Sequence, residues 1–111
     1  MTTFHDLPTI SAERANTGKL YQEFIRVPML SVGVYGLPGG GTDPQKPHRE
    51  DEVYYVVRGR ARMRVGSEEQ VVKAGSVIFV EAKAEHRFFD ISEELEVLVF
   101  FAPAESDQNG L

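Results

Sequence analysis

The stretch Glu52–Val65 reads EVYYVVRGRARMRV and decides the fold class. Its first half is a run of β-branched and aromatic residues, which favour an extended backbone. In its second half small and apolar residues alternate with arginines, and this period of two is typical of a half-buried antiparallel strand. We therefore expect two strands, Glu52–Val57 and Arg60–Val65, with a turn at Arg58-Gly59 between them.

Further short strands are expected on both sides of this stretch, separated by segments rich in glycine, proline and acidic residues. They are Leu20–Val27, Met29–Leu37, Gln70–Val72, Ser76–Val80, His86–Asp90 and Leu95–Phe101. No segment has a convincing helical period, so we expect about eight antiparallel strands and little helix. An all-β chain hides its strand edges by closing, and the sequence therefore predicts a sandwich or a closed barrel.

The chain has 111 residues, which is enough for one hydrophobic core and too few for two. We expect this single domain to span residues 20–103, because all the strand signals lie within that range. Residues 1–19 would be a polar N-terminal extension, with room for a single helical turn after Ser11. Residues 104–111 would be a flexible tail that frays from Glu105 onward.

The composition excludes several classes of function. Twelve basic and seventeen acidic residues leave a net charge of −5, which argues against binding to nucleic acid or to an anionic membrane surface. No apolar run approaches the ~20 residues that cross a bilayer, and the absence of cysteine excludes disulfides and thiolate metal sites. The nucleophile elbow G-x-S-x-G is also missing. We expect a soluble, cytoplasmic protein that binds a small molecule.

Two of the three histidines lie where a connection enters a strand. His48 follows the Gly/Pro-rich connection Pro38–Pro47, and His86 begins a later strand. His5 lies in the N-terminal extension and has no expected role. Glu52 stands four residues after His48, so both side chains point to one face if the chain is extended. Two imidazoles and a carboxylate could bind a divalent metal ion with coordination positions open, although a solvated strand edge would explain the same residues.

Two stretches, Gly41–Gly59 and Gly75–Asp90, resemble the two signature motifs of the cupin superfamily. In the first motif, His48 stands in the place of the second histidine, and Glu52 is followed by six residues and the closing glycine. In the second motif, His86 stands in the place of the histidine. The resemblance implies a small jelly-roll barrel with a metal ion held inside its mouth, and it implies His48, Glu52 and His86 as the ligands.

The chain departs from these motifs in ways that leave the metal site open. Lys46 replaces the first histidine, and Glu81 and Lys83 replace the proline and glycine of the second motif. A protonated ammonium group repels a divalent cation, and burial would have to remove its proton before it could bind one. Three arrangements remain: a three-ligand site with Lys46 turned away, a fourth ligand from Gln45 or Lys46, or no metal with Lys46 ion-paired to Glu52.

The candidate ligands also bear on activity. Two histidines and one carboxylate suit one divalent ion of iron, manganese, nickel or zinc. Because strand alternation predicts a mostly apolar cavity inside the barrel, we expect an enzyme that acts on a small, partly apolar organic molecule. An oxygenase-type reaction is the first expectation and an isomerase or lyase reaction the next, with Tyr54 or Lys46 as the candidate acid or base. A non-catalytic ligand-binding barrel and a metal-free structural barrel are the alternatives.

Strand alternation predicts which side chains face the inside of the barrel. Tyr54, Phe88 and Asp90 would point inward together with the metal ligands. The resemblance implies a homodimer that pairs through an apolar outer face. We expect that outer face to consist of Tyr55, Val57, Ile78 and Val80.

Overall fold

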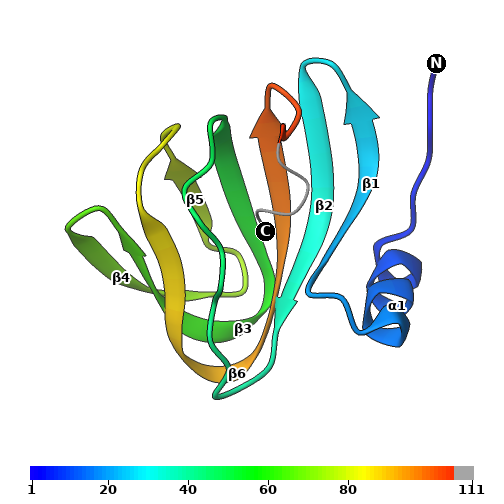
Figure 1. The fold of residues 1–111 in the computed structure, drawn as a ribbon. Helices are drawn as coiled ribbons and strands as arrows, with labels where there is room; N and C mark the ends of the chain where they lie inside the picture. Colours follow the sequence, from blue (N-terminus) through cyan, green and yellow to red (C-terminus); the bar gives the residue numbers. More distant parts are fainter. Residues whose placement is uncertain (107–111) are drawn as a thin grey trace.

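The computed structural model describes residues 1–106 and confirms the all-β jelly-roll class (Figure 1). In chain order the elements are α1 Leu7–Thr17, β1 Tyr21–Val27, β2 Leu30–Leu37, β3 Asp51–Val65, β4 Glu68–Lys73, β5 Val77–Val80 and β6 His86–Ala102. The strands pair antiparallel in the order β1-β2-β6-β3-β4, and β5 pairs with β3. The sheet curls into a barrel, and α1 lies outside it beside β1.

The central stretch forms one long strand, β3, instead of two strands and a turn. Gly59 lies inside this strand with a φ of 99°, and the pairing with β6 shifts register between Val56 and Arg58 and again before Arg60. A Cβ atom at Gly59 would collide with the backbone of Glu94. The predicted turn at Arg58-Gly59 is therefore wrong, because the glycine makes a bulge that bends a continuous strand.

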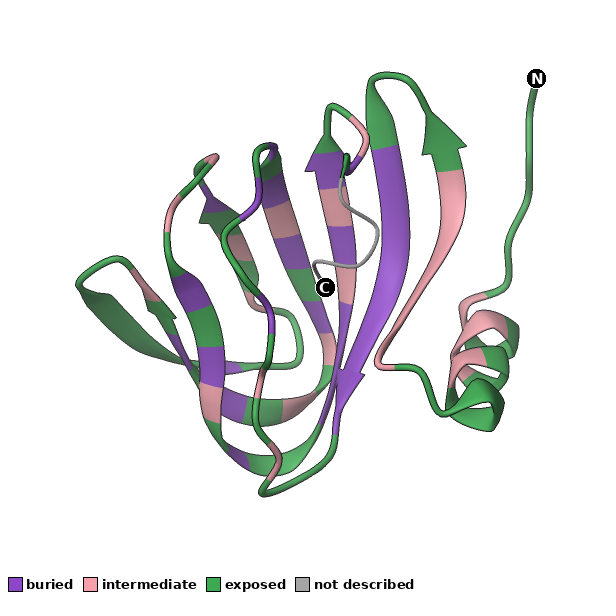
Figure 2. Ribbon diagram, in the orientation of Figure 1, coloured by how far each residue is buried: buried purple, intermediate pink, exposed green. Residues whose placement is uncertain are grey.

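The core lies inside the curled sheet, where buried and exposed residues alternate along β3 (Figure 2). Tyr54 is fully buried and Phe88 is 1% exposed, so the prediction that they point inward is confirmed. Asp90 is exposed, contrary to prediction. Its backbone has a φ of 48°, which interrupts the alternation of β6, and the next residue, Ile91, is buried in its place.

The facing of β5 is the reverse of the predicted one. Val77 and Phe79 are 68% and 61% exposed, whereas Val80 is 1% exposed and Ile78 is half-buried. Val80 is the cross-strand partner of Glu52 in β3, and such partners share one face of a sheet. The predicted outer face is therefore wrong at Ile78 and Val80. The four apolar residues of β5 have no alternation from which the facing could be predicted.

The N-terminal extension contains an eleven-residue helix, α1, where a single turn after Ser11 was expected. Asp6 caps its first turn by accepting a hydrogen bond from the Thr9 N–H at 3.2 Å, and Gly18 ends it with a φ of 74°. No residue of α1 is buried. No helix in the described part of the chain is long and apolar enough to cross a membrane.

The segment that follows β6 turns back into the fold. Glu105, where fraying was expected to begin, is fully buried. Residues 107–111 of the expected tail lie outside the described residues.

Candidate metal site

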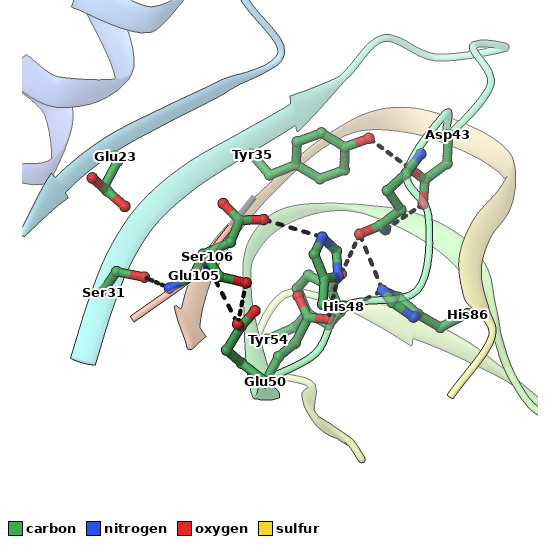
Figure 3. Close-up of polar contacts among 12 residues, drawn as sticks. Glu23, Ser31, Tyr35, Asp43, His48, Glu50, Tyr54, His86, Glu105 and Ser106 are labelled. Carbon is green, nitrogen blue, oxygen red and sulfur yellow. Dashed lines mark hydrogen bonds and ion pairs between the residues drawn. The ribbon is translucent and has the colours of Figure 1, made fainter. Parts of the chain in front are cut away.

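Three side chains from separate parts of the chain meet inside the barrel (Figure 3). His48 lies near the end of the connection between β2 and β3, Glu52 near the start of β3, and His86 at the start of β6. His48 Nδ1 is 3.3 Å and His86 Nε2 is 3.1 Å from the same oxygen of Glu52, Oε1. All three residues are buried, and one donor atom from each lies within 4.8 Å of the other two.

The surrounding protein leaves this group without complete hydrogen bonding. Among the described residues, both ring nitrogens of His48 and both carboxylate oxygens of Glu52 are buried without an aligned hydrogen-bond partner. Such atoms are rare in folded proteins, and each one needs an explanation. Two imidazoles and one carboxylate are suitable ligands for a divalent transition metal. The residues present therefore fit a metal ion at this position.

The buried charges of the site change its proton affinities. Burial lowers the pKa of His48, but contacts with Glu105 and Glu52 outweigh this effect and raise the pKa to about 9. Burial raises the pKa of Glu52, but the two histidines together hold it below the ordinary value of 4.5. The two histidines favour the charged form of Glu52, and buried carboxylates on two sides of His48 favour a positive charge between them. A proton or a metal ion would supply that charge.

A hydrogen-bonded network joins the site to the Gly/Pro-rich connection (Figure 3). The Tyr54 hydroxyl donates to Gln45 Oε1 at 2.6 Å, and the same oxygen lies 3.1 Å from His86 Nε2. The Gln45 amide donates to Asp43 at 2.6 Å, and the Tyr35 hydroxyl donates to the other oxygen of Asp43 at 2.5 Å. Asp43 thus orients Gln45 toward the site. Sequence reasoning missed Asp43, because it lies in a segment that signalled only a loop.

The structure separates the two candidates for a fourth ligand. Gln45 is buried, with its amide oxygen at the site. Lys46 is exposed, and within the described residues it forms no ion pair with Glu52. Of the three arrangements that the sequence left open, the Lys46–Glu52 ion pair is therefore not observed, and Lys46 is turned away from the site.

The hydroxyl of Tyr54, a candidate acid or base, is fully buried. Burial, followed by the charges of Glu52 and Asp43, raises its pKa well above the ordinary value of 10.0. The hydroxyl therefore keeps its proton at neutral pH and cannot act as a phenolate base. The exposed position of Lys46 places that candidate outside the buried site.

A pocket of about 370 Å³ reaches the site at His86. Its wall is mostly charged or polar and consists of Asp43, Gln45, Pro47, Arg64, Gly66, Glu85, His86 and Arg87. A pocket of about 460 Å³ between β4 and β5 is more apolar, but none of the three candidate ligands lines it. Large side chains such as Tyr54 and Phe88 fill the interior. The entrance to the site is thus polar, and the apolar interior that strand alternation predicted is filled by packed side chains.

Comparisons with known proteins agree with this fold. A family model described as a cupin domain matches residues 33–102. An uncharacterised protein of Streptomyces coelicolor is 51% identical over 100 residues, which cover 90% of this chain and 95% of that protein.

Solved structures give the same result. TT1209 from Thermus thermophilus is 28% identical with a TM-score of 0.73, over 93% of this chain and 99% of the other. An RmlC-like cupin from Shewanella frigidimarina is 24% identical with a TM-score of 0.69, over 78% of each chain. The barrel with its site inside defines a domain of the jelly-roll class. The chain belongs to the cupin family.

Proposed function

We propose that the protein is a metal-dependent enzyme in which His48, Glu52 and His86 bind one divalent ion of iron, manganese, nickel or zinc. The observation that supports this proposal is the buried group of three ligands whose polar atoms lack aligned protein partners. Three protein ligands leave coordination positions open for a substrate. The bound ion would supply redox or Lewis-acid chemistry, so an oxygenase-type reaction is proposed first and an isomerase or lyase reaction second.

Groups of the chain itself would prepare the site for this chemistry. The His86 Nδ1 atom lies 2.9 Å from the carbonyl oxygen of Ala84, which can only accept a hydrogen bond. Nδ1 would therefore carry the ring proton, and Nε2, which lies 3.1 Å from Glu52 Oε1 and 3.1 Å from Gln45 Oε1, would bind the ion. The Tyr54 hydroxyl stays protonated and donates to Gln45 beside His86, so it would have to give up this hydrogen bond before it could donate to a bound molecule.

The substrate class that this entrance favours is a small organic molecule with polar groups. Its pocket, about 370 Å³ in volume, presents both cations and anions at its wall, including Arg87 and Glu85. A molecule that carries hydroxyl, carbonyl or carboxylate groups would find hydrogen-bond partners there. A wholly apolar molecule would leave these charged groups without partners.

A non-catalytic ligand-binding barrel is the alternative function. It is favoured by the burial of His48 and His86, each only 6% exposed, because a reacting molecule needs direct access to the ion. Turnover separates the two functions: an enzyme would convert a substrate with a rate that depends on metal content. A binding protein would hold the molecule unchanged.

Elemental analysis of protein purified without a metal-chelating tag tests the metal site. We expect near-stoichiometric divalent metal in the natural protein and loss of that metal in the variants His48→Ala and His86→Ala. The matched control is His5→Ala, because His5 is exposed and its ring contacts only Thr3 and Phe24 among the described residues. Full metal occupancy in both site variants would contradict the ligand assignment. Iron would direct activity assays to oxygenase reactions, and zinc or nickel to Lewis-acid reactions.

We also propose that the protein forms a homodimer. Tyr55 and Val77, which are cross-strand partners, are 41% and 68% exposed, and Phe79 on the same face is 61% exposed. A contiguous exposed apolar face of this kind supports association, and pairing it with its own copy gives a closed two-fold assembly. Light scattering is expected to give the dimer mass for the natural protein and the monomer mass for Phe79→Ser. A monomer in both cases would contradict the proposal.

A further inference from the structure

The short segment that follows β6 is fixed in place by polar contacts. The backbone N–H of Glu105 donates to Ser31 Oγ at 3.0 Å, and its carbonyl oxygen accepts a hydrogen bond from the Arg26 guanidinium at 2.6 Å. Ser106 donates to the buried carboxylate of Glu50 through its N–H at 3.2 Å and through its hydroxyl at 2.7 Å. Side chains from β1, β2 and the residues before β3 thus determine the path of this segment. Figure 3 shows the contacts of Ser31 and Glu50.

This path carries the Glu105 carboxylate into the interior, where the residue is fully buried. Its Oε2 atom lies 3.2 Å from Nε2 of His48, and Figure 3 shows the two groups facing each other. Neither oxygen of the Glu105 carboxylate has an aligned hydrogen bond from a described residue, and His48 is the one ion-pair partner of this carboxylate among them. Burial of a carboxylate is costly unless a cation or a donor faces it. The position of Glu105 is therefore explained by His48.

The two candidate histidine ligands are held in the same manner. Each ring turns one nitrogen toward Glu52 and the other toward an oxygen outside the ligand group: Nδ1 of His86 faces the Ala84 carbonyl at 2.9 Å, and Nε2 of His48 faces Glu105. An outer oxygen that receives the second ring N–H fixes the tautomer and the orientation of a metal-bound histidine. The backbone supplies this oxygen for His86, and a distant side chain supplies it for His48.

We propose that Glu105 is a positioning residue of the metal site, which holds the proton on Nε2 of His48 so that the Nδ1 lone pair faces the ion beside Glu52. This inference rests on the proposed function, since it assigns a role at the same site. Glu105 is not itself in the ligand group, because its oxygen contacts the edge of the His48 ring opposite to Glu52. Replacing an outer residue of this kind typically weakens metal binding ~10–100-fold.

Chelator competition with Zn²⁺ provides the first measurement. Glu105→Ala is expected to bind Zn²⁺ about 10–100-fold more weakly than the natural protein. Glu105→Gln keeps the size of the side chain and an acceptor oxygen, so we expect its affinity to lie between the two. The matched control is Glu96→Gln: Glu96 is also a buried carboxylate, but its partners are Ser11 and Arg58, and its replacement should leave Zn²⁺ affinity unchanged.

A spectroscopic measurement separates positioning from a general loss of structure. In the Co²⁺-loaded natural protein, proton NMR should show two exchangeable, paramagnetically shifted ring N–H signals, one from each histidine. Glu105→Ala should lose the His48 signal through exchange with water and keep the His86 signal. If Glu105→Ala does not fold, Glu105→Gln decides, because faster exchange of the His48 N–H alone is expected there.

The possible results distinguish the two levels of the proposal. Unchanged Zn²⁺ affinity and two unchanged N–H signals in the Glu105 variants would overturn the positioning role and leave the metal site standing. Failure of the natural protein to bind Zn²⁺ or Co²⁺ would overturn both. A drop in affinity equally large in Glu96→Gln would also overturn the positioning role, since the effect would then come from any buried carboxylate.

Discussion

The helix α1 precedes the barrel strands in the sequence, and the segment around Glu105 follows them. The two differ in how they contact the barrel. The helix has eleven residues, none of them buried, and its interior backbone hydrogen bonds form within the helix, with Asp6 capping its first turn. The segment at Glu105 has no regular structure, so its backbone groups are bonded by Ser31 and Arg26 of the barrel. The regular element is the more loosely attached one, and the irregular segment brings a charge to the site.

Removing each segment in turn compares the two directly, and the largest effect is expected from removal of the segment that carries Glu105. Truncation after Ala104 removes Glu105 and leaves the buried carboxylate of Glu50 without its donors from Ser106. We expect it to lower the free energy of unfolding by about 3 kcal/mol and to weaken Zn²⁺ binding at least ~10-fold. Deletion of residues 1–18 should leave Zn²⁺ affinity unchanged. Urea denaturation and chelator competition provide the two measurements.

Truncation after Ser106 is the control for this comparison. It keeps Glu105, Ser106 and their contacts, so the contribution of these contacts to stability and Zn²⁺ affinity should be retained. If the helix deletion weakened Zn²⁺ binding as strongly as truncation after Ala104, the contrast between the two segments would be wrong.

A pH dependence should also distinguish the two segments. In the metal-free protein the pKa of His48 is raised from 6.5 to about 9 by Glu105 and Glu52. A raised folded-state pKa stabilises the protein fully below pH 6.5, and this contribution is lost as the pH rises through 9. Glu52 has a lowered pKa, so its contribution is present above pH 4.5 and is lost as the pH falls below that value.

Urea denaturation of chelator-treated protein between pH 5.5 and 9.5 checks this expectation. The natural protein should lose stability toward high pH, and Glu105→Gln should lose less, since one of the two carboxylates facing His48 is then neutral. Deletion of α1 should leave the slope unchanged. Equal slopes for the natural protein and Glu105→Gln would show that Glu105 does not stabilise the protonated histidine.

The sequence predicted that His48 and Glu52, four residues apart, share one face of an extended chain. The structure brings the two side chains together, but His48 lies in the connection before β3 and the chain bends at residues 49–50, so closeness in the sequence and not strand alternation explains their contact. His86 reaches them across the interior of the barrel, so only its place in the second motif signalled its role. Glu105 had no such signal: a glutamate in a polar terminal segment is usually solvated, and its burial depends on the distant donors Ser31 and Arg26.

The fold shows the same limit. Alternation along β3 correctly predicted which of its side chains face inward. The four apolar residues of β5 do not alternate with polar ones, so their facing follows only from the pairing of β5 with Glu52 and its neighbours. The helix was missed although Asp6, Pro8 and Gly18 stand at its ends. Those capping signals are local, but a helix that buries nothing has no apolar stripe to reveal it.

A smaller effect is expected where α1 contacts the sheet. Ser11 Oγ donates to Glu96 Oε1 at 2.8 Å, and Glu96 is 4% exposed. Ser11→Ala removes this hydrogen bond and should lower the free energy of unfolding by about 1 kcal/mol, with Zn²⁺ affinity unchanged. Ser67→Ala, at an exposed serine in the turn before β4, is the control and should have no effect on either quantity. A loss of Zn²⁺ affinity in Ser11→Ala would mean that the helix contact reaches the site.

The smallest effect is expected at the N-cap of α1. The carboxylate of Asp6 accepts the Thr9 N–H at 3.2 Å, and a cap of this kind stabilises a helix by about 1 kcal/mol. Because α1 buries no residue, Asp6→Ala should speed amide hydrogen exchange within residues 7–17 while the exchange of β2 and the global free energy of unfolding change little. Asp6→Asn restores a capping oxygen and should restore slow exchange. If Asp6→Ala instead lowered global stability as much as truncation after Ala104, the helix would be as firmly joined to the barrel as the segment that carries Glu105.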